Sequence, residues 1–103
     1  MLDTLVYAVN EARQAGTQTA LVSIIATQGS TPRKAGASML VYPDGRVVGT
    51  IGGGCAEAEA RLQALTALDD CRSFVYRISM SGETAANEGM ACGGNMDVFI
   101  QVV

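Results

Sequence analysis

Three consecutive glycines, Gly52, Gly53 and Gly54, constrain this chain more than any other feature of its sequence. They separate a stretch typical of a strand, which ends at Ile51, from a stretch typical of a helix, which begins at Cys55. Glycine weakens both helices and strands, so three in a row indicate a turn where a side chain would obstruct something. A helix N-terminus binds anions readily, and Cys55 adds a thiol at its edge. We therefore expect a ligand to approach the backbone at this turn.

The composition is that of a folded protein with a substantial core. The chain has 103 residues, of which 49% are hydrophobic and 17% are charged, so we expect a single domain over residues 1–103. Its 7 Lys plus Arg against 10 Asp plus Glu argue against nucleic acid or an anionic membrane as the main partner. The sequence has no apolar run of about 20 residues and no signal-peptide pattern, so we expect a cytoplasmic protein.

The hydrophobic pattern indicates a sheet with helices packed on it. It predicts helices at residues 2–15 and 55–68, and strands at residues 19–27, 38–42, 46–51, 72–79 and 96–103. The first strand is apolar enough to be buried on both faces, and a turn at residues 43–45 makes the next two strands a hairpin. The second helix has one apolar face, formed by Ala58, Leu62, Leu65 and Leu68. Strands and helices do not alternate regularly, so we predict an α/β fold with a mixed β-sheet and about two main helices.

Three glycine-rich segments adjoin predicted strands, at residues 29–36, 51–57 and 89–95. The first offers hydroxyl groups and two cations, the second a helix N-terminus, and the third further backbone donors. If the strand ends converge, these segments would together cradle a phosphate or a similar anion. The glycine run is followed by Cys55 rather than by Lys and Ser or Thr, and no G-x-G-x-x-G pattern is present. A nucleotide hydrolase or an NAD site is therefore disfavoured.

The cysteines and the missing histidine narrow the chemistry further. Cys55, Cys71 and Cys92 are an odd number, which favours reduced thiols over a disulfide framework. Cys55 is a better candidate for reactivity than Cys92 because a helix N-terminus favours the thiolate, but sequence pattern alone favours the simpler interpretation of a small buried residue at the base of the helix. The chain has no histidine, which removes the usual general base and the commonest transition-metal ligand. We predict no catalytic residue and no metal ligand.

Two stretches carry a resemblance to a known family. GSTPRKAGASMLVYPDGRVVGTIGGGCAEAE and GMACGGNMDVFIQ resemble the N-terminal domain of the XdhC/CoxI family, with a G-S-T/S-P-R loop, a G-G-G-C-x-E turn and a C-G-G turn at matching distances. This family consists of accessory proteins for molybdenum hydroxylases such as xanthine dehydrogenase and carbon monoxide dehydrogenase. The resemblance implies a chaperone that binds the molybdenum cofactor, a pterin dithiolene carrying a phosphate, as cargo. It also implies assistance in sulfuration of the cofactor and its insertion into the hydroxylase.

The resemblance also implies a set of cofactor-binding residues. They match the family motifs position by position and are Ser30, Thr31 and Arg33 with the intervening Pro32, then Gly52, Gly53, Gly54, Cys55 and Glu57, and finally Cys92, Gly93 and Gly94. Its implied partners are a cysteine desulfurase and an apo molybdenum hydroxylase subunit. Longer members continue into a Rossmann-like domain that this chain lacks, so a separate Rossmann-domain partner or a homo-oligomer is also expected.

Two other function classes stay open from the residues alone. A cysteine-dependent sulfur-transfer or redox protein would use Cys55 as a reactive thiol. A regulatory interaction module would use the glycine segments only as turns and would bind no small ligand. An accessory protein that is not itself an enzyme is what the family resemblance implies, and it agrees with the absence of a usual general base.

Overall fold

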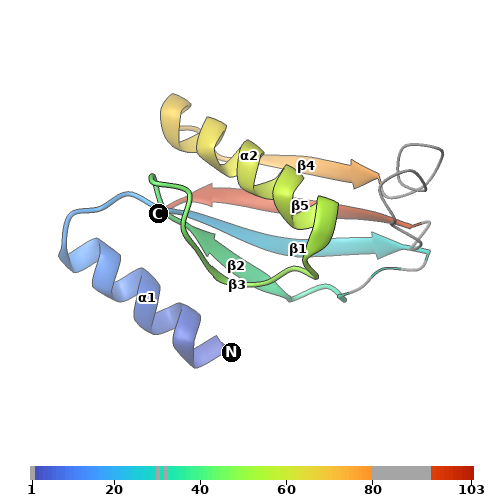
Figure 1. Ribbon diagram of the computed structural model, residues 1–103, viewed down its shortest axis with the longest axis horizontal. Coiled ribbons are helices and arrows are strands. Elements are labelled where there is room, and N and C mark those ends of the chain that lie inside the picture. Colours follow the sequence, from blue (N-terminus) through green and yellow to red (C-terminus); the bar gives the residue numbers. More distant parts are fainter. Residues whose placement is uncertain (1, 30, 32, 80–93) are drawn as a thin grey trace.

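One five-stranded sheet organises the protein, whose computed structural model describes residues 2–29, 31, 33–79 and 94–103 (Figure 1). The strand order across the sheet is β3-β2-β1-β5-β4, and each neighbouring pair is antiparallel. The strands are β1 (Ala20–Gln28), β2 (Ser38–Val41), β3 (Val47–Gly49), β4 (Phe74–Ser79) and β5 (Asn95–Val102). The helices are α1 (Leu2–Gln14), which precedes β1, and α2 (Gly54–Asp70), which joins β3 to β4.

The predicted α/β class, with one sheet and two helices, is confirmed, and the one difference is that the sheet is antiparallel rather than mixed. A strand–helix–strand connection gives a parallel pair only when the two strands become neighbours. Here α2 carries the chain from β3 at one edge of the sheet to β4 at the other, and three strands stand between them. The hairpin of β2 and β3 is confirmed, although β3 is shorter than the predicted strand.

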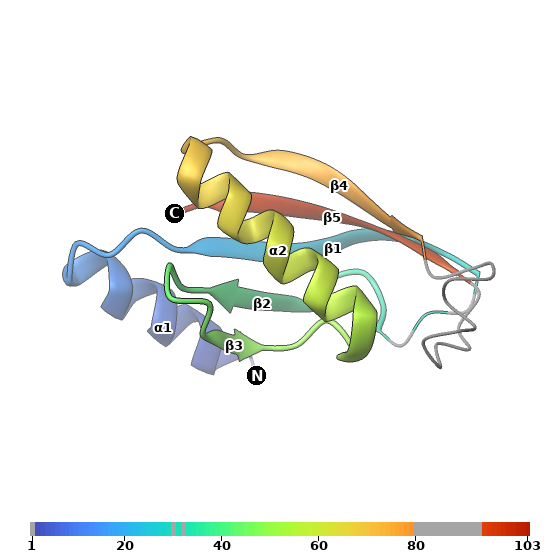
Figure 2. The same ribbon diagram turned by 45° about the horizontal axis from the view of Figure 1, so that its top comes forward.

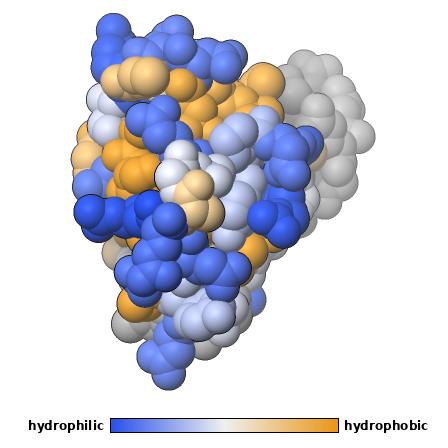
Figure 3. Space-filling model, turned by 90° about the vertical axis from the view of Figure 1, so that its left-hand side faces the viewer, coloured by the Kyte–Doolittle hydropathy of each residue, from blue (hydrophilic) through white to orange (hydrophobic). Residues whose placement is uncertain are grey.

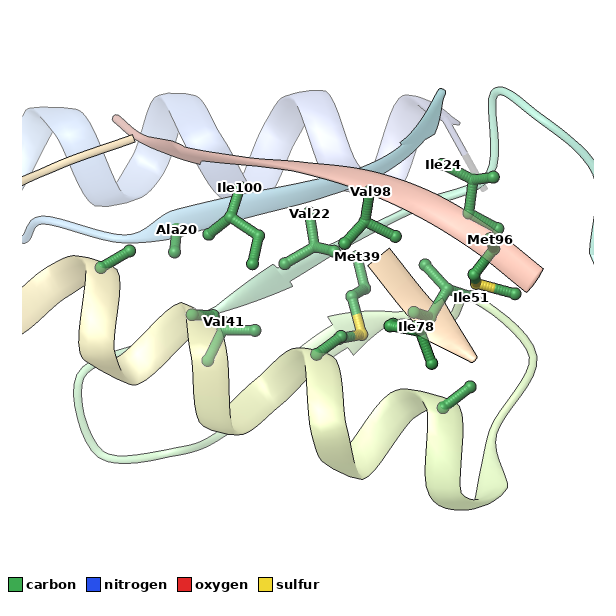
Figure 4. Close-up of a cluster of buried hydrophobic side chains, with 14 residues drawn as sticks. Ala20, Val22, Ile24, Met39, Val41, Ile51, Ile78, Met96, Val98 and Ile100 are labelled. Atoms are coloured by element: carbon green, nitrogen blue, oxygen red, sulfur yellow. The ribbon is translucent and has the colours of Figure 1, made fainter. Parts of the chain in front are cut away.

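The two helices cover opposite faces of the sheet (Figures 1 and 2). Side chains alternate between faces along β1, so Ala20, Val22 and Ile24 join the core under α2, whereas Leu21 packs with the cluster around α1. The prediction that this strand is buried on both faces holds only in part, because its first half is buried on the α2 face and partly buried on the α1 face. Its register with β5 shifts between Ile24 and Ala26, and Ile25 is 50% exposed there. Most of the core therefore lies between α2 and the sheet (Figure 4).

The buried face of α2 differs from the predicted one. Alanines form it, namely Ala56, Ala60, Ala64 and Ala67, each at most 1% exposed. Of the predicted face, Ala58 is exposed and Leu62 is 58% exposed, while Leu65 and Leu68 are partly buried against the core. A helix with apolar residues on several sides can bury either face, and small residues let its backbone lie close to the sheet. The prediction was wrong because it assigned the largest apolar side chains to the buried face, whereas the helix buries the small ones that let its backbone lie closest to the sheet.

Polar contacts attach the β2–β3 turn to α2. Asp44 Oδ1 accepts a hydrogen bond from the Arg46 N–H (2.9 Å), and Arg61 Nε of α2 donates to the Gly45 carbonyl oxygen (2.8 Å). The Arg46 guanidinium lies 4.1 Å from the centre of the Tyr42 ring. Figure 3 views this end of the molecule, where hydrophilic residues surround smaller hydrophobic areas. Neither described helix is long and apolar enough to cross a membrane.

Candidate functional site

The glycine run forms the turn that leads into α2, as predicted. Its φ angles are 127° at Gly52, 76° at Gly53 and 63° at Gly54, in the region that side chains rarely adopt. Gly53 is the N-cap residue and has a ψ angle of −171°. A Cβ atom on Gly54 would meet no atom of another described residue within 4 Å. The glycines are therefore required by the backbone conformation, and none of the described residues fills the space in front of Gly54.

Two backbone donors of this turn are available to a ligand. The N-cap makes no side-chain hydrogen bond, and the Gly53 carbonyl oxygen accepts a hydrogen bond from the Glu57 N–H (3.4 Å). Within the described residues, the N–H groups of Gly53 and Gly54 have no hydrogen-bond partner. They lie at the positive end of a 17-residue helix, where an anion is stabilised. The turn thus fits a phosphate or a similar anionic group.

A side-chain network holds the same turn from inside. Thr50 Oγ1 accepts a hydrogen bond from the Gly52 N–H (3.0 Å) and donates one to Glu57 Oε2 (2.9 Å). It joins the segment that follows β3 to the first turn of α2. A Cβ atom on Gly53 would lie 3.8 Å from the same carboxylate oxygen. Of the predicted site residues, the structure thus brings Gly52, Gly53 and Glu57 together around one turn.

Cys55 lies in the first turn of α2 and its side chain is half-buried. The sequence predicted this position at the start of the helix. Cys71 is exposed and lies at the other end of the helix, as its left-handed C-cap residue, with a φ angle of 52°. A helix of this length separates the two thiols by roughly 25 Å. Cys71 is therefore outside the candidate site.

The first glycine-rich segment reaches the same end of the sheet. Thr31 Oγ1 donates to the Arg33 carbonyl oxygen (2.9 Å), and the Arg33 and Lys34 side chains are exposed. The Gly36 N–H then donates to the carbonyl oxygen of Ile24 (2.8 Å), which returns the chain to β1. In both ribbon views the segment entering β2 lies beside the start of α2 (Figures 1 and 2). Within the described residues, no hydrogen bond or ion pair joins Thr31 or Arg33 to the glycine turn, and Ser30 lies outside those residues.

Of the third glycine-rich segment, the structure describes Gly94 and Asn95. Cys92 and Gly93 lie outside the described residues, whereas Gly94 is buried and directly precedes β5. Asn95 pairs with Gln28 at the end of β1 and with Ser79 at the end of β4. The last residues of β1 and β4 and the first residue of β5 therefore lie side by side at one end of the sheet. Met96 and Ile51 are fully buried in the same cluster, so this end lies next to the glycine turn (Figure 4).

The sequence did not predict two polar contacts made by carboxylates of α2. Thr50 carried no signal of its own, because its bond to Glu57 depends on the shape of the glycine turn between them. Glu59, interpreted as a helix-start acid, instead accepts a hydrogen bond from the Tyr76 hydroxyl of β4 (2.5 Å). This bond raises the pKa of Tyr76 above its usual value of 10.0. No three His, Cys, Asp or Glu side chains gather among the described residues in a way that could hold a metal ion.

Comparison with known protein families identifies the family of this chain. The model of the XdhC and CoxI family matches residues 12–79, which contain the complete glycine turn and all of α2. The chain belongs to the XdhC and CoxI family. The predicted resemblance is therefore confirmed over most of the chain.

Curated relatives and a solved structure agree with this membership. The chain is 38% identical over 96 residues to a Bacillus subtilis (strain 168) protein named as a probable xanthine dehydrogenase subunit, covering 92% of this chain and 27% of the relative. It is 32% identical over 90 residues to the molybdenum cofactor insertion chaperone PaoD of Escherichia coli (strain K12), covering 87% and 28% respectively. A crystal structure described as a xanthine dehydrogenase from Bacillus halodurans matches with a TM-score of 0.79 and 26% identity, over 95% of this chain and 30% of that one. The chain thus spans less than a third of each of these relatives.

Proposed function

We propose that this protein binds the molybdenum cofactor and delivers it to a hydroxylase of the xanthine dehydrogenase or carbon monoxide dehydrogenase type. The family membership and the name of its relative PaoD, a molybdenum cofactor insertion chaperone, support this function. The observation that carries it is the glycine turn, where two backbone donors without partners in the described residues adjoin a half-buried thiol. An anionic, sulfur-rich cargo suits that combination of groups.

Different groups of the chain would bind different parts of the cofactor. The N–H groups of Gly53 and Gly54 would bind its phosphate, and the space in front of Gly54 would admit it. Arg33 would neutralise part of its charge. Cys55 or Cys92 would lie near the molybdenum or its terminal sulfur. The other predicted binding residues, Ser30, Thr31, Gly52, Glu57, Gly93 and Gly94, would shape the two loops and the turn. None of these tasks needs a general base.

The partners of this function are proposals as well. A cysteine desulfurase would first supply sulfur, and the cargo would then pass to an apo molybdenum hydroxylase subunit. A separate chain with a Rossmann-like domain, or a second copy of this chain, would close the site from the other side. We propose that this takes place in the cytoplasm.

The direct test is retention of the cofactor. The purified chain is incubated with freshly released molybdenum cofactor, separated from unbound material by rapid gel filtration, and assayed for molybdenum and pterin. We expect about one molybdenum and one pterin for each protein molecule in the protein fraction. The loaded chain should also activate an apo hydroxylase when the two are mixed. Retention no greater than that of an unrelated acidic protein of similar size would contradict the function.

The thiol is tested by paired variants. Cys55→Ser should lower the retained molybdenum, because the hydroxyl replaces a soft sulfur donor near the metal. Cys71→Ser is the matched control, since it changes an exposed thiol at the far end of the same helix and should retain cofactor like the parent. Equal retention by both variants would remove Cys55 from the mechanism.

A cysteine-dependent sulfur-transfer or redox protein is the second candidate, favoured by the partial exposure of Cys55 in the first turn of α2. It requires a thiolate at neutral pH. The rate of Cys55 alkylation, followed against pH in a Cys71→Ser background, distinguishes the two functions. A rate that is already maximal at neutral pH, together with no cofactor retention, would favour sulfur transfer. A stable complex with a hydroxylase but no retained cofactor would instead indicate an interaction module.

A further inference from the structure

The Thr50 hydroxyl links the Gly52 amide to the Glu57 carboxylate through two hydrogen bonds whose donors and acceptors are fixed. A hydroxyl has one proton to donate and lone pairs to accept, an amide N–H only donates, and an ionised carboxylate only accepts. The order is therefore fixed as Gly52 N–H to Thr50 Oγ1 (3.0 Å), and Thr50 Oγ1–H to Glu57 Oε2 (2.9 Å). Thr50 and Glu57 lie on either side of the glycine turn and are both half-buried. The turn is thus held by a relay anchored on α2.

Direct contact between Glu57 and an anionic ligand is electrostatically unfavourable. The carboxylate is stabilised in the first turn of the helix by the helix dipole, but it repels a second negative charge at the same place. We propose that Glu57 and Thr50 are a positioning pair that sets the direction of the glycine-turn amides and does not touch the ligand.

The relay decides which amides remain for a ligand. Because Gly52 gives its N–H to Thr50, it is used inside the turn, while the N–H groups of Gly53 and Gly54 keep no partner within the described residues. With positive φ angles at all three glycines, the turn can rotate these amides once the relay is removed. The effect on ligand binding rests on the proposed function, whereas the fixed orientation of Gly52 does not.

Amide hydrogen exchange tests the orientation without any ligand. In Thr50→Val the Gly52 N–H loses its acceptor, and we expect its exchange, measured by NMR, to rise roughly tenfold or more. Thr50→Ser keeps a hydroxyl and should exchange like the parent. Tyr76→Phe is the matched control because it removes another hydroxyl bonded to a carboxylate of α2, that of Glu59, away from the turn. Unchanged Gly52 exchange in Thr50→Val, or an equal rise in Tyr76→Phe, would overturn the positioning role.

Retention of freshly released molybdenum cofactor tests the consequence. Thr50→Val and Glu57→Ala should each lower affinity by roughly tenfold, about the effect of one hydrogen bond to a charged group, and the double variant should fall no further. Glu57→Gln keeps an acceptor for Thr50 and should retain cofactor. If Glu57→Ala loses cofactor while Thr50→Val retains it fully, Glu57 contacts the ligand directly and the inference is overturned. Losses of affinity that add up in the double variant would overturn it as well. If the parent retains no cofactor, the proposed function fails and the Gly52 exchange still decides whether the pair positions the turn.

Discussion

The Tyr76 hydroxyl on β4 donates a hydrogen bond to Glu59 Oε1 on α2, with 2.5 Å between the two oxygens. It joins residues 17 positions apart in the sequence and attaches the helix to the edge strand of the sheet. The alanine face of α2 fixes how close the helix lies to the sheet, and this bond helps to fix its position along β4. The glycine turn at the start of α2 is therefore carried by a helix that is held at several points.

Removing this hydroxyl should destabilise the fold modestly. Tyr76→Phe leaves the ring in place and deletes one partly buried hydrogen bond, so we expect a loss of about 1 kcal/mol in the free energy of unfolding, measured by urea denaturation at neutral pH. The bond raises the pKa of Tyr76, so its contribution is complete below the usual value of 10.0 and disappears as pH rises through the raised pKa. The parent and the variant should therefore converge at alkaline pH. A stability difference that is constant across this range would contradict the assignment.

The alanine face of α2 should not tolerate larger side chains. Ala60 is completely buried against the sheet, so Ala60→Leu must displace the helix or its neighbours and should cost about 1–3 kcal/mol. Ala58→Leu adds the same atoms two residues away on an exposed position and should change stability by no more than about 0.5 kcal/mol. Thermal unfolding of both variants gives the measurement. Equal effects would mean that α2 does not bury the face described here.

The sequence predicted the helices and strands well because their signals are local. The periodic apolar residues of α1, the β-branched run of β1 and the turn at Asp44 and Gly45 each act within a few residues. The buried face of α2 was not predictable in this way, because alanines and leucines surround the helix and the sheet selects between them. The three consecutive glycines likewise predicted the turn by themselves, because glycine weakens both helices and strands.

The polar contacts around that turn could not be predicted from local pattern. Thr50 and Glu57 are seven residues apart, and their hydrogen bond exists only because three positive φ angles bring the helix start back over the strand end. The neighbouring positions of the end of β1, the end of β4 and the start of β5 depend on strand order, which places Gln28, Asn95 and Ser79 side by side. Each of these relationships is tertiary, and no single segment encodes it.

Alanine at the N-cap should separate backbone strain from ligand binding. At Gly53, φ is 76° and ψ is −171°, a conformation essentially restricted to glycine, so Gly53→Ala should cost about 1–3 kcal/mol and misdirect the turn. Gly16→Ala is the matched control after the end of α1, with a φ angle of 73° and no atom of another described residue within 4 Å of the added Cβ. Both variants should lower the unfolding midpoint, but only Gly53→Ala should lose cofactor. Cofactor loss in Gly16→Ala at matched folded fraction would show that stability alone controls binding.

The salt bridge between β4 and β5 should make the thermal stability of the protein fall at acidic pH. Arg77 donates from Nε to Asp97 Oδ1 (2.8 Å) and from Nη2 to Oδ2 (3.2 Å), and these hydrogen bonds lower the pKa of Asp97 from its usual 3.8. A lowered pKa means that the contribution is present above the usual value and is lost as pH falls through the lowered one. Because the side chains are 58% and 25% exposed, the effect should be small and weakened by salt. Thermal midpoints of the parent and Asp97→Asn, compared at low salt from neutral to acidic pH, should converge only below the usual pKa of the carboxyl. Midpoints that differ equally at every pH would show that the variant acts through packing rather than through the ion pair.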